Sequence, residues 1–211
     1  MPSTDWITRV AELGVALDES QIAQLTQYGF LMRQWNTFVT LVSAGDLAQL
    51  EDLHVVDSLS LAPLVRELVA PGEVLLDIGT GGGFPAIPLA VALPDRKFVL
   101  MERSAKKVSF LRKVMGALKL GQVSLINGSF PEAVPPEEPV AMTARAVERA
   151  DVVLADVAEV LPDGCVFLCQ SGDPRGKLDS EMFHVEHFED AWSRSGARRG
   201  SLYLVRRIPG R

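Results

Sequence analysis

Hydrophobic positions follow two different rhythms along this chain. In the N-terminal part they recur every three or four residues, first over residues 18–39, where Asp18 or Ser20 can cap a helix, and again over residues 54–69. A proline-glycine pair at 71–72 then interrupts the pattern. We therefore expect a helical N-terminal extension over residues 1–70.

Beyond this break, short apolar runs alternate with helical stretches. Strands alternating with helices of such length predict βαβ units and a parallel sheet. We expect an α/β fold with a doubly wound, mostly parallel sheet, in which residues 71–211 form one compact unit. The predicted strands are 74–78, 97–101, 123–127, 139–143 and 165–169, the helices 85–93, 105–118 and 147–160, and two strands at 184–188 and 201–207 close the sheet.

Composition narrows the class of protein. With 211 residues, 47% of them hydrophobic and 23% charged, the chain suits one soluble globular domain with a small appendage. Its longest nearly apolar run, residues 85–94, is about half as long as a membrane-spanning helix, and the N-terminus lacks the pattern of a secretory signal. Cys165 and Cys169 stand in an apolar stretch and are predicted to be core residues. We expect a cytoplasmic protein with no membrane segment and no metal.

The strongest chemical signal follows the first predicted strand. This strand ends in Asp77 and runs into a turn that contains Gly79, Gly81 and Gly83. Glycines let the backbone approach a ligand closely, and the turn lies where doubly wound sheets bind their ligands. Glu102, at the end of the second predicted strand, can accept hydrogen bonds from both ribose hydroxyls of an adenosyl ligand.

A nicotinamide-dependent dehydrogenase shares much of this arrangement, but its fingerprint is G-x-G-x-x-G. Counted from Gly79 the sixth position is Phe84, and counted from Gly81 it is Ala86, so neither register fits. The order of an acid, one residue and then G-x-G-x-G is typical of class I S-adenosyl-L-methionine-dependent methyltransferases. We interpret the chain as such a methyltransferase, with a non-catalytic nucleoside- or RNA-binding module as an alternative.

Several further stretches are distinctive. They are Trp35-Asn36, residues 54–59 (HVVDSL), 79–90 (GTGGGFPAIPLA), 102–114 and 118–123, and Thr143-Ala144-Arg145-Ala146. Together they resemble the bacterial glucose-inhibited division protein B family, whose members methylate guanine N7 in small-subunit ribosomal RNA. The resemblance covers nearly the whole chain and includes its helical extension.

The resemblance implies roles for individual residues. Gly79, Phe84 and Arg145 fall on cofactor-binding positions of that family, and Phe130 and Pro131 on the loop that flanks the adenine. Together with the glycine-turn residues, the candidate cofactor site comprises Asp77, Gly79, Gly81, Phe84, Glu102, Phe130, Pro131 and Arg145.

Two of the side chains singled out have competing interpretations. Arg145 is the candidate catalytic residue, which fixes the cofactor or the base, and the alternative is an ion pair with an acid such as Glu148. For His54, a helix-capping role stands beside a functional one. Asp77 is expected to hold the glycine turn rather than to contact the substrate.

Three positions depart from the family pattern. Ser129 replaces an arginine, Ser171 replaces a lysine, and residues 40–42 (Thr40-Leu41-Val42) replace an NLT triplet. These groups lie around the presumed RNA and methyl-transfer site, so another RNA or a small molecule stays open as the substrate. No pair of a nucleophile and a general base stands out in the sequence. This fits methylation at guanine N7, because N7 has a free lone pair and the enzyme only has to position it against the methyl group.

The charge is unevenly distributed, although the net charge is −6. Basic residues concentrate in residues 101–120 and 191–211. We expect these two segments to form one positive face beside the candidate site, and this face is expected to bind RNA phosphates. The alternative is that they are merely solvated faces. The expected partner is small-subunit ribosomal RNA or the small ribosomal subunit, bound by a monomer.

Overall fold

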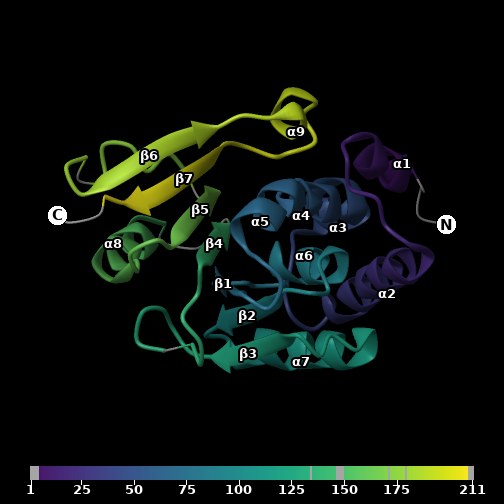
Figure 1. Cartoon of the computed structure of the whole chain (residues 1–211). Coiled ribbons are helices and arrows are strands. Elements are labelled where there is room, and N and C mark those ends of the chain that lie inside the picture. The colour runs from purple at the N-terminus through teal and green to yellow at the C-terminus, as the bar shows by residue number, and fades with distance from the viewer. Residues whose placement is uncertain (1–4, 134, 146–149, 171, 179, 209–211) are drawn as a thin grey trace.

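A computed structural model describes residues 5–133, 135–145, 150–170, 172–178 and 180–208. Helices cover both faces of a seven-stranded sheet, and the N-terminal helices pack beside it (Figure 1). The strands are β1 Val74–Ile78, β2 Lys97–Glu102, β3 Val123–Asn127, β4 Ala141–Arg145, β5 Val166–Gln170, β6 Phe183–Phe188 and β7 Leu202–Arg207.

The strand order is β3-β2-β1-β4-β5-β7-β6. The first five strands in this order are parallel, and β7 pairs antiparallel with both β5 and β6. The predicted doubly wound, mostly parallel sheet is therefore confirmed. Because the strand order reverses between β1 and β4, the carboxyl ends of these two strands open the crevice in which such sheets bind ligands.

Each face of the sheet has its own hydrophobic core, as alternation along the strands requires. Leu75, Phe98 and Leu100 face α2 (Glu19–Trp35), α6 (Ala86–Ala92) and α7 (Ala105–Leu118). Leu76 and Val99 face α8 (Ala150–Val160) on the other side. Cys165 and Cys169 are both buried in this second cluster, so the expectation of two core residues is confirmed.

The N-terminal part is helical, as predicted, but its second segment is broken. Its elements are α1 (Asp5–Glu12), α2, α3 (Ala44–Ala48), a π-helical turn η1 (Glu51–Val55), α4 (Val56–Leu59) and α5 (Ala62–Leu68). Asp18 caps α2 through a capping box with Gln21. The expectation of one continuous helix over residues 54–69 is wrong because Pro63, in the first turn of α5, would clash with the preceding turn of a continuous helix.

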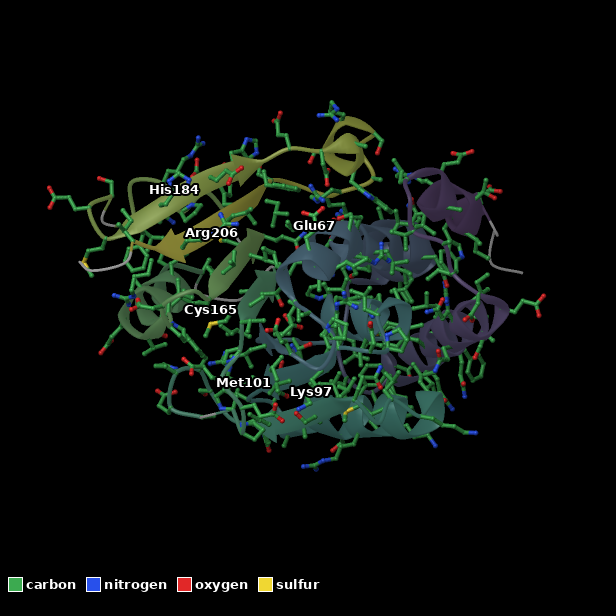
Figure 2. The ribbon with its side chains drawn as sticks, in the orientation of Figure 1. Glu67, Lys97, Met101, Cys165, His184 and Arg206 are labelled. Carbon is green, nitrogen blue, oxygen red and sulfur yellow. The ribbon has the colours of Figure 1, made fainter. Side chains whose placement is uncertain are left out.

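The two basic segments do not meet. Residues 101–120 include α7, beside β3 at one end of the sheet, whereas α9 (Ala191–Arg194) and β7 lie toward the other end (Figure 1). Met101, in the first segment, and Arg206, in the second, lie apart in the same way in Figure 2. The expectation of one shared positive face is wrong, because β1, β4 and β5 separate β2 from β7. Within the described part of the chain, no helix is long and apolar enough to cross a bilayer.

Candidate active site

The glycine turn follows β1 and is packed closely against the N-terminal helices. Gly79, Gly81 and Gly83 have φ angles of 65°, 59° and 99°, a region that favours glycine. A Cβ on Gly83 would lie 2.6 Å from Ile87 Cγ1, so close packing also requires glycine there. The Tyr28 hydroxyl of α2 donates a hydrogen bond of 2.6 Å to the Gly82 carbonyl. The helical extension therefore supports the turn directly.

Glu102 is fixed beside this turn. Its Oε2 accepts a hydrogen bond from the Gly81 backbone N–H at 3.0 Å, and its Oε1 accepts one from the Ser104 N–H at 2.8 Å. The side chain is nearly buried. A carboxylate has about four lone-pair sites, so each oxygen keeps capacity for a further donor. The structure thus brings the predicted acid and the predicted glycine turn into direct contact.

Asp77 is fully buried at the end of β1. It lies opposite Thr143 in the parallel ladder and accepts a 2.8 Å hydrogen bond from the Thr143 hydroxyl. Its second oxygen, Oδ2, has no hydrogen-bond partner among the described residues. Burial raises the pKa of Asp77 to about 7, and hydrogen bonding from Thr143 partly opposes this shift. The Asp77 carboxyl group therefore ionises less readily than an exposed aspartate.

Three side chains pack against the ring of Phe84, and two of them, His54 and Arg145, are candidates from the sequence. Its ring stacks on His54 with centroids 5.0 Å apart, and the Arg145 guanidinium lies 5.1 Å above it. Tyr28 packs against Phe84 at 5.3 Å in a tilted arrangement. Phe84 is only 5% exposed, so its ring is a buried surface against which Arg145 and His54 pack.

Arg145, at the end of β4, is bound by residues of the helical extension. Its Nη1 donates to Asp57 Oδ2 at 2.6 Å and its Nη2 donates to His54 Nδ1 at 2.7 Å. Both side chains of the Arg145–Asp57 pair are nearly buried. Glu148, the acid suggested by the sequence, lies outside the described residues. The sequence signal for His54 and Asp57 was their place in the stretch 54–59 that carries the family resemblance, and it did not link them to Arg145.

His54 is held in a single tautomer by its two partners. A guanidinium can only donate, so Nδ1 must be the acceptor and the proton resides on Nε2. Nε2 lies 3.1 Å from Asp46 Oδ2, a suitable acceptor. Burial, together with the positive charge of Arg145, lowers the pKa of His54 and favours the neutral ring. His54 therefore accepts a hydrogen bond from Arg145, and η1, which contains His54, has no side-chain capping hydrogen bond among the described residues.

The loop after β3 carries the candidates Phe130 and Pro131 and is tied to Glu102. The backbone N–H of Gly128 and the side chain of Asn127 both donate to the Glu102 carbonyl, each at 3.1 Å. Phe130 is half-buried against the α8-side core, and Ser129 is exposed. The structure therefore places this loop at the same edge of the sheet as Glu102.

A second loop covers the glycine turn from the α2 side. Asn36 organises it, because its Oδ1 accepts from the N–H groups of Leu41 and Val42 at 2.8 and 3.0 Å. The Leu41 Cβ lies 3.6 Å from the position that a Cβ on Gly82 would occupy. Thr40, one of the departures from the family pattern, is exposed on this loop, whereas Ser171 lies outside the described residues.

The sequence of the chain is similar to those of known proteins. A family model described as GidB, rRNA small subunit methyltransferase G, matches residues 21–183. "Ribosomal RNA small subunit methyltransferase G" of Sorangium cellulosum is 40% identical over 180 residues, which cover 79% of this chain and 71% of that protein.

Solved structures show the same fold at low sequence identity. A structure titled MtNAS in complex with S-adenosylmethionine is 16% identical with a TM-score of 0.61, covering 96% of this chain and 76% of that one. Precorrin-6y C5,15-methyltransferase from Geobacter metallireducens is 14% identical with a TM-score of 0.51, covering 79% and 90%. From the family match and the close relative, the chain belongs to the GidB family, the methyltransferases described as rRNA small subunit methyltransferase G.

Proposed function

We propose that this chain transfers the methyl group of S-adenosyl-L-methionine to N7 of a guanine in small-subunit (16S) ribosomal RNA. The observation that carries the proposal is the Glu102 carboxylate, fixed by the Gly81 and Ser104 N–H groups beside a left-handed glycine turn. The name of the family, and that of the Sorangium cellulosum relative, supports the ribosomal substrate.

The residues present fit an adenosyl ligand. Among the described residues, only backbone, the Gly79 carbonyl 3.8 Å away, approaches the position of a Cβ on Gly81, so none of their side chains blocks the turn there. The free acceptor capacity of Glu102 suits two ribose hydroxyls, and the half-buried Phe130 suits the flat face of an adenine. We propose that Asp77, Gly79, Gly81, Phe84, Glu102, Phe130, Pro131 and Arg145 hold the cofactor.

When bound, the cofactor supplies an electrophilic sulfonium methyl group. Guanine N7 attacks through a free lone pair, so the protein has no proton to remove and acts by positioning, which can contribute roughly 7 kcal/mol or more. Arg145 is suited to this task, since Asp57 and His54 occupy two of its five N–H donors. We propose that the remaining donors fix the carboxylate of the cofactor or O6 of the guanine.

Calorimetry tests the cofactor part of the proposal. S-adenosyl-L-methionine should bind at micromolar levels, and Glu102→Gln should weaken it, because the amide loses the charged acceptor while keeping the shape. Binding of a nicotinamide dinucleotide in its place would overturn this assignment.

The substrate part needs small subunits that lack the modification. Purified protein should label 16S RNA or intact subunits from a deletion strain, and chemical cleavage should locate the N7-methylguanosine. If the cofactor binds but neither substrate is labelled, the alternative is a methyltransferase for another RNA or a small molecule. The exposed Ser129 and Thr40, which replace polar family residues, favour that alternative. A metal-free monomer acting in the cytoplasm completes the proposal.

We further propose that residues 1–70 form an extension of the methyltransferase unit at 71–211 and do not fold apart from it. Tyr28 donates a buried hydrogen bond to the Gly82 carbonyl, and the buried Asp57 carboxylate accepts one from Arg145, so both residues tie the extension to the sheet-forming part. Expression of residues 71–211 alone should therefore yield an unstable protein.

A further inference from the structure

Among the described residues, the basic side chains of α7 differ from most of those near the C-terminus in having no acidic partner. Four C-terminal arginines form ion pairs: Arg198 with Asp190, Arg199 with Asp46, Arg206 with Glu186 and Arg207 with Asp163. On α7, the basic residues make no ion pair with any described residue; these are Lys106, Lys107, Arg112 and Lys113. The positive charge of α7 is therefore available to an external anion.

Phe38 is an exposed aromatic residue just beyond the end of α2, the helix whose Trp35 packs on α7. Its side chain is 78% exposed, although it follows the largely apolar contact between α2 and α7. The Phe38 N–H donates to the Trp35 carbonyl, and the Trp35 ring packs 5.8 Å from the ring of Phe110 on α7. Phe38 is thus one turn beyond the α2 residue that contacts α7.

Two lysines lie on the same side of α7 as that contact. Lys106 and Lys113 are four residues before and three residues after Phe110, and this spacing places all three on one helical face. Both lysines are exposed. The α2–α7 contact is therefore bordered by two exposed lysines of α7, and Phe38 follows the α2 end of this contact by one turn.

This surface leads toward the candidate active site. Helices α2 and α7 run antiparallel, since Gln24 binds the Leu118 carbonyl while Trp35 contacts Phe110. The end of α2 that precedes Phe38 consequently points toward the start of α7, where the Ser104 N–H binds Glu102. Leu41, from the loop that contains Phe38, lies against Gly82 of the glycine turn.

We propose that Phe38, Lys106 and Lys113 form a docking surface for a single-stranded segment of the RNA substrate, with an unpaired base stacked on Phe38 and phosphates on the two lysines. The inference rests on the proposed function and adds to it the path by which RNA reaches the site. Single-stranded RNA is recognised by this combination of aromatic rings and basic groups, and stacking tolerates any base. An acidic protein surface would form ion pairs with the two lysines but would leave the Phe38 ring exposed to water, so it fits this surface less well than RNA does.

Binding of fluorescently labelled, unmodified 16S RNA to the full chain tests the surface. Phe38→Ala should raise the Kd about 5- to 100-fold while cofactor binding is kept. Phe30→Ala is the matched control. Phe30 is 65% exposed on α2, but it lies about 140° around this helix from Trp35, the residue that contacts α7. The Kd of this control should equal that of the unaltered protein.

The lysines are tested by the salt dependence of the same Kd. Lys106→Gln with Lys113→Gln should reduce the slope of log Kd against log salt by about 1.4 to 1.8, since each phosphate contact contributes roughly 0.7 to 0.9. Arg206→Gln, at the far end of the sheet, should leave the slope unchanged.

The outcomes separate this surface from the proposed function. If the Phe38 and lysine variants bind and methylate RNA as the unaltered protein does, the surface is wrong and the function stands. If they bind free RNA normally but lose affinity for small subunits, the surface contacts a ribosomal protein, which overturns the RNA assignment. If the unaltered protein neither binds nor methylates RNA, the proposed function itself fails.

Discussion

Replacing Asp57 by asparagine should destabilise the protein strongly. Asp57 is 1% exposed, and its carboxylate joins three parts of the chain. It belongs to α4, accepts from Arg145 of β4 at 2.6 Å, and accepts from the Arg199 backbone N–H at 2.6 Å. Asparagine keeps the shape but not the charge, so the Arg145 guanidinium would stay buried without a counter-ion.

The magnitude follows from the burial of both partners, whose side chains are 12% and 2% exposed. Removing one member of a buried pair costs about 3–5 kcal/mol, because the other charge is left uncompensated. For a chain of this size each kcal/mol lowers the Tm by about 2–4 °C, so the Tm should fall by about 6–20 °C.

Urea unfolding followed by tryptophan fluorescence measures this loss. The double variant Asp57→Asn with Arg145→Met should recover much of the stability, since no unpaired charge remains. Lys97→Gln breaks the exposed Lys97–Glu137 pair and serves as the control, with an expected loss of about 1 kcal/mol or less. A loss below about 1 kcal/mol for Asp57→Asn, or strict additivity in the double variant, would refute the reasoning.

Three further predictions concern pH and packing. The pKa of His54 is lowered in the folded state, so the contribution of His54 to stability should be constant above about pH 6.5 and fall below it as the unfolded chain takes up the proton; the stability difference between the unaltered protein and His54→Gln, from urea titrations at several pH values, should show this dependence. The pKa of Asp77 is raised to about 7, so its ionisation should cost stability as pH rises from about 4 to 7, and Asp77→Asn should stabilise the protein at pH 8 by up to about 4 kcal/mol, measured in the same way. Gly83→Ala should lower the Tm and the calorimetric affinity for the cofactor because its Cβ meets Ile87, whereas Gly116→Ala in α7, with open space around it, should raise the Tm and leave the affinity unchanged.

Local spacing in the sequence was sufficient for the main elements and for half of the candidate site. Apolar runs separated by helical stretches predicted the parallel strands, because a buried strand must be apolar on both faces. Asp18 and Ser20 were the two candidate helix caps from their place before an apolar repeat, and the structure shows that Asp18 is the cap. Asp77, Gly81 and Glu102 were predicted to act together because the carboxyl ends of adjacent parallel strands meet at one edge of the sheet.

Contacts between distant segments were decided only by the tertiary structure. The partner of Arg145 is Asp57, 88 residues away, and no window of sequence contains both. The tautomer of His54 depends on that same arginine, which reaches its ring only after β4 has paired with β1. The basic segments were separated by the strand order, which places β1, β4 and β5 between β2 and β7. Periodicity in a sequence reports which face of an element is buried, whereas the neighbour that buries it depends on how all the elements pack together.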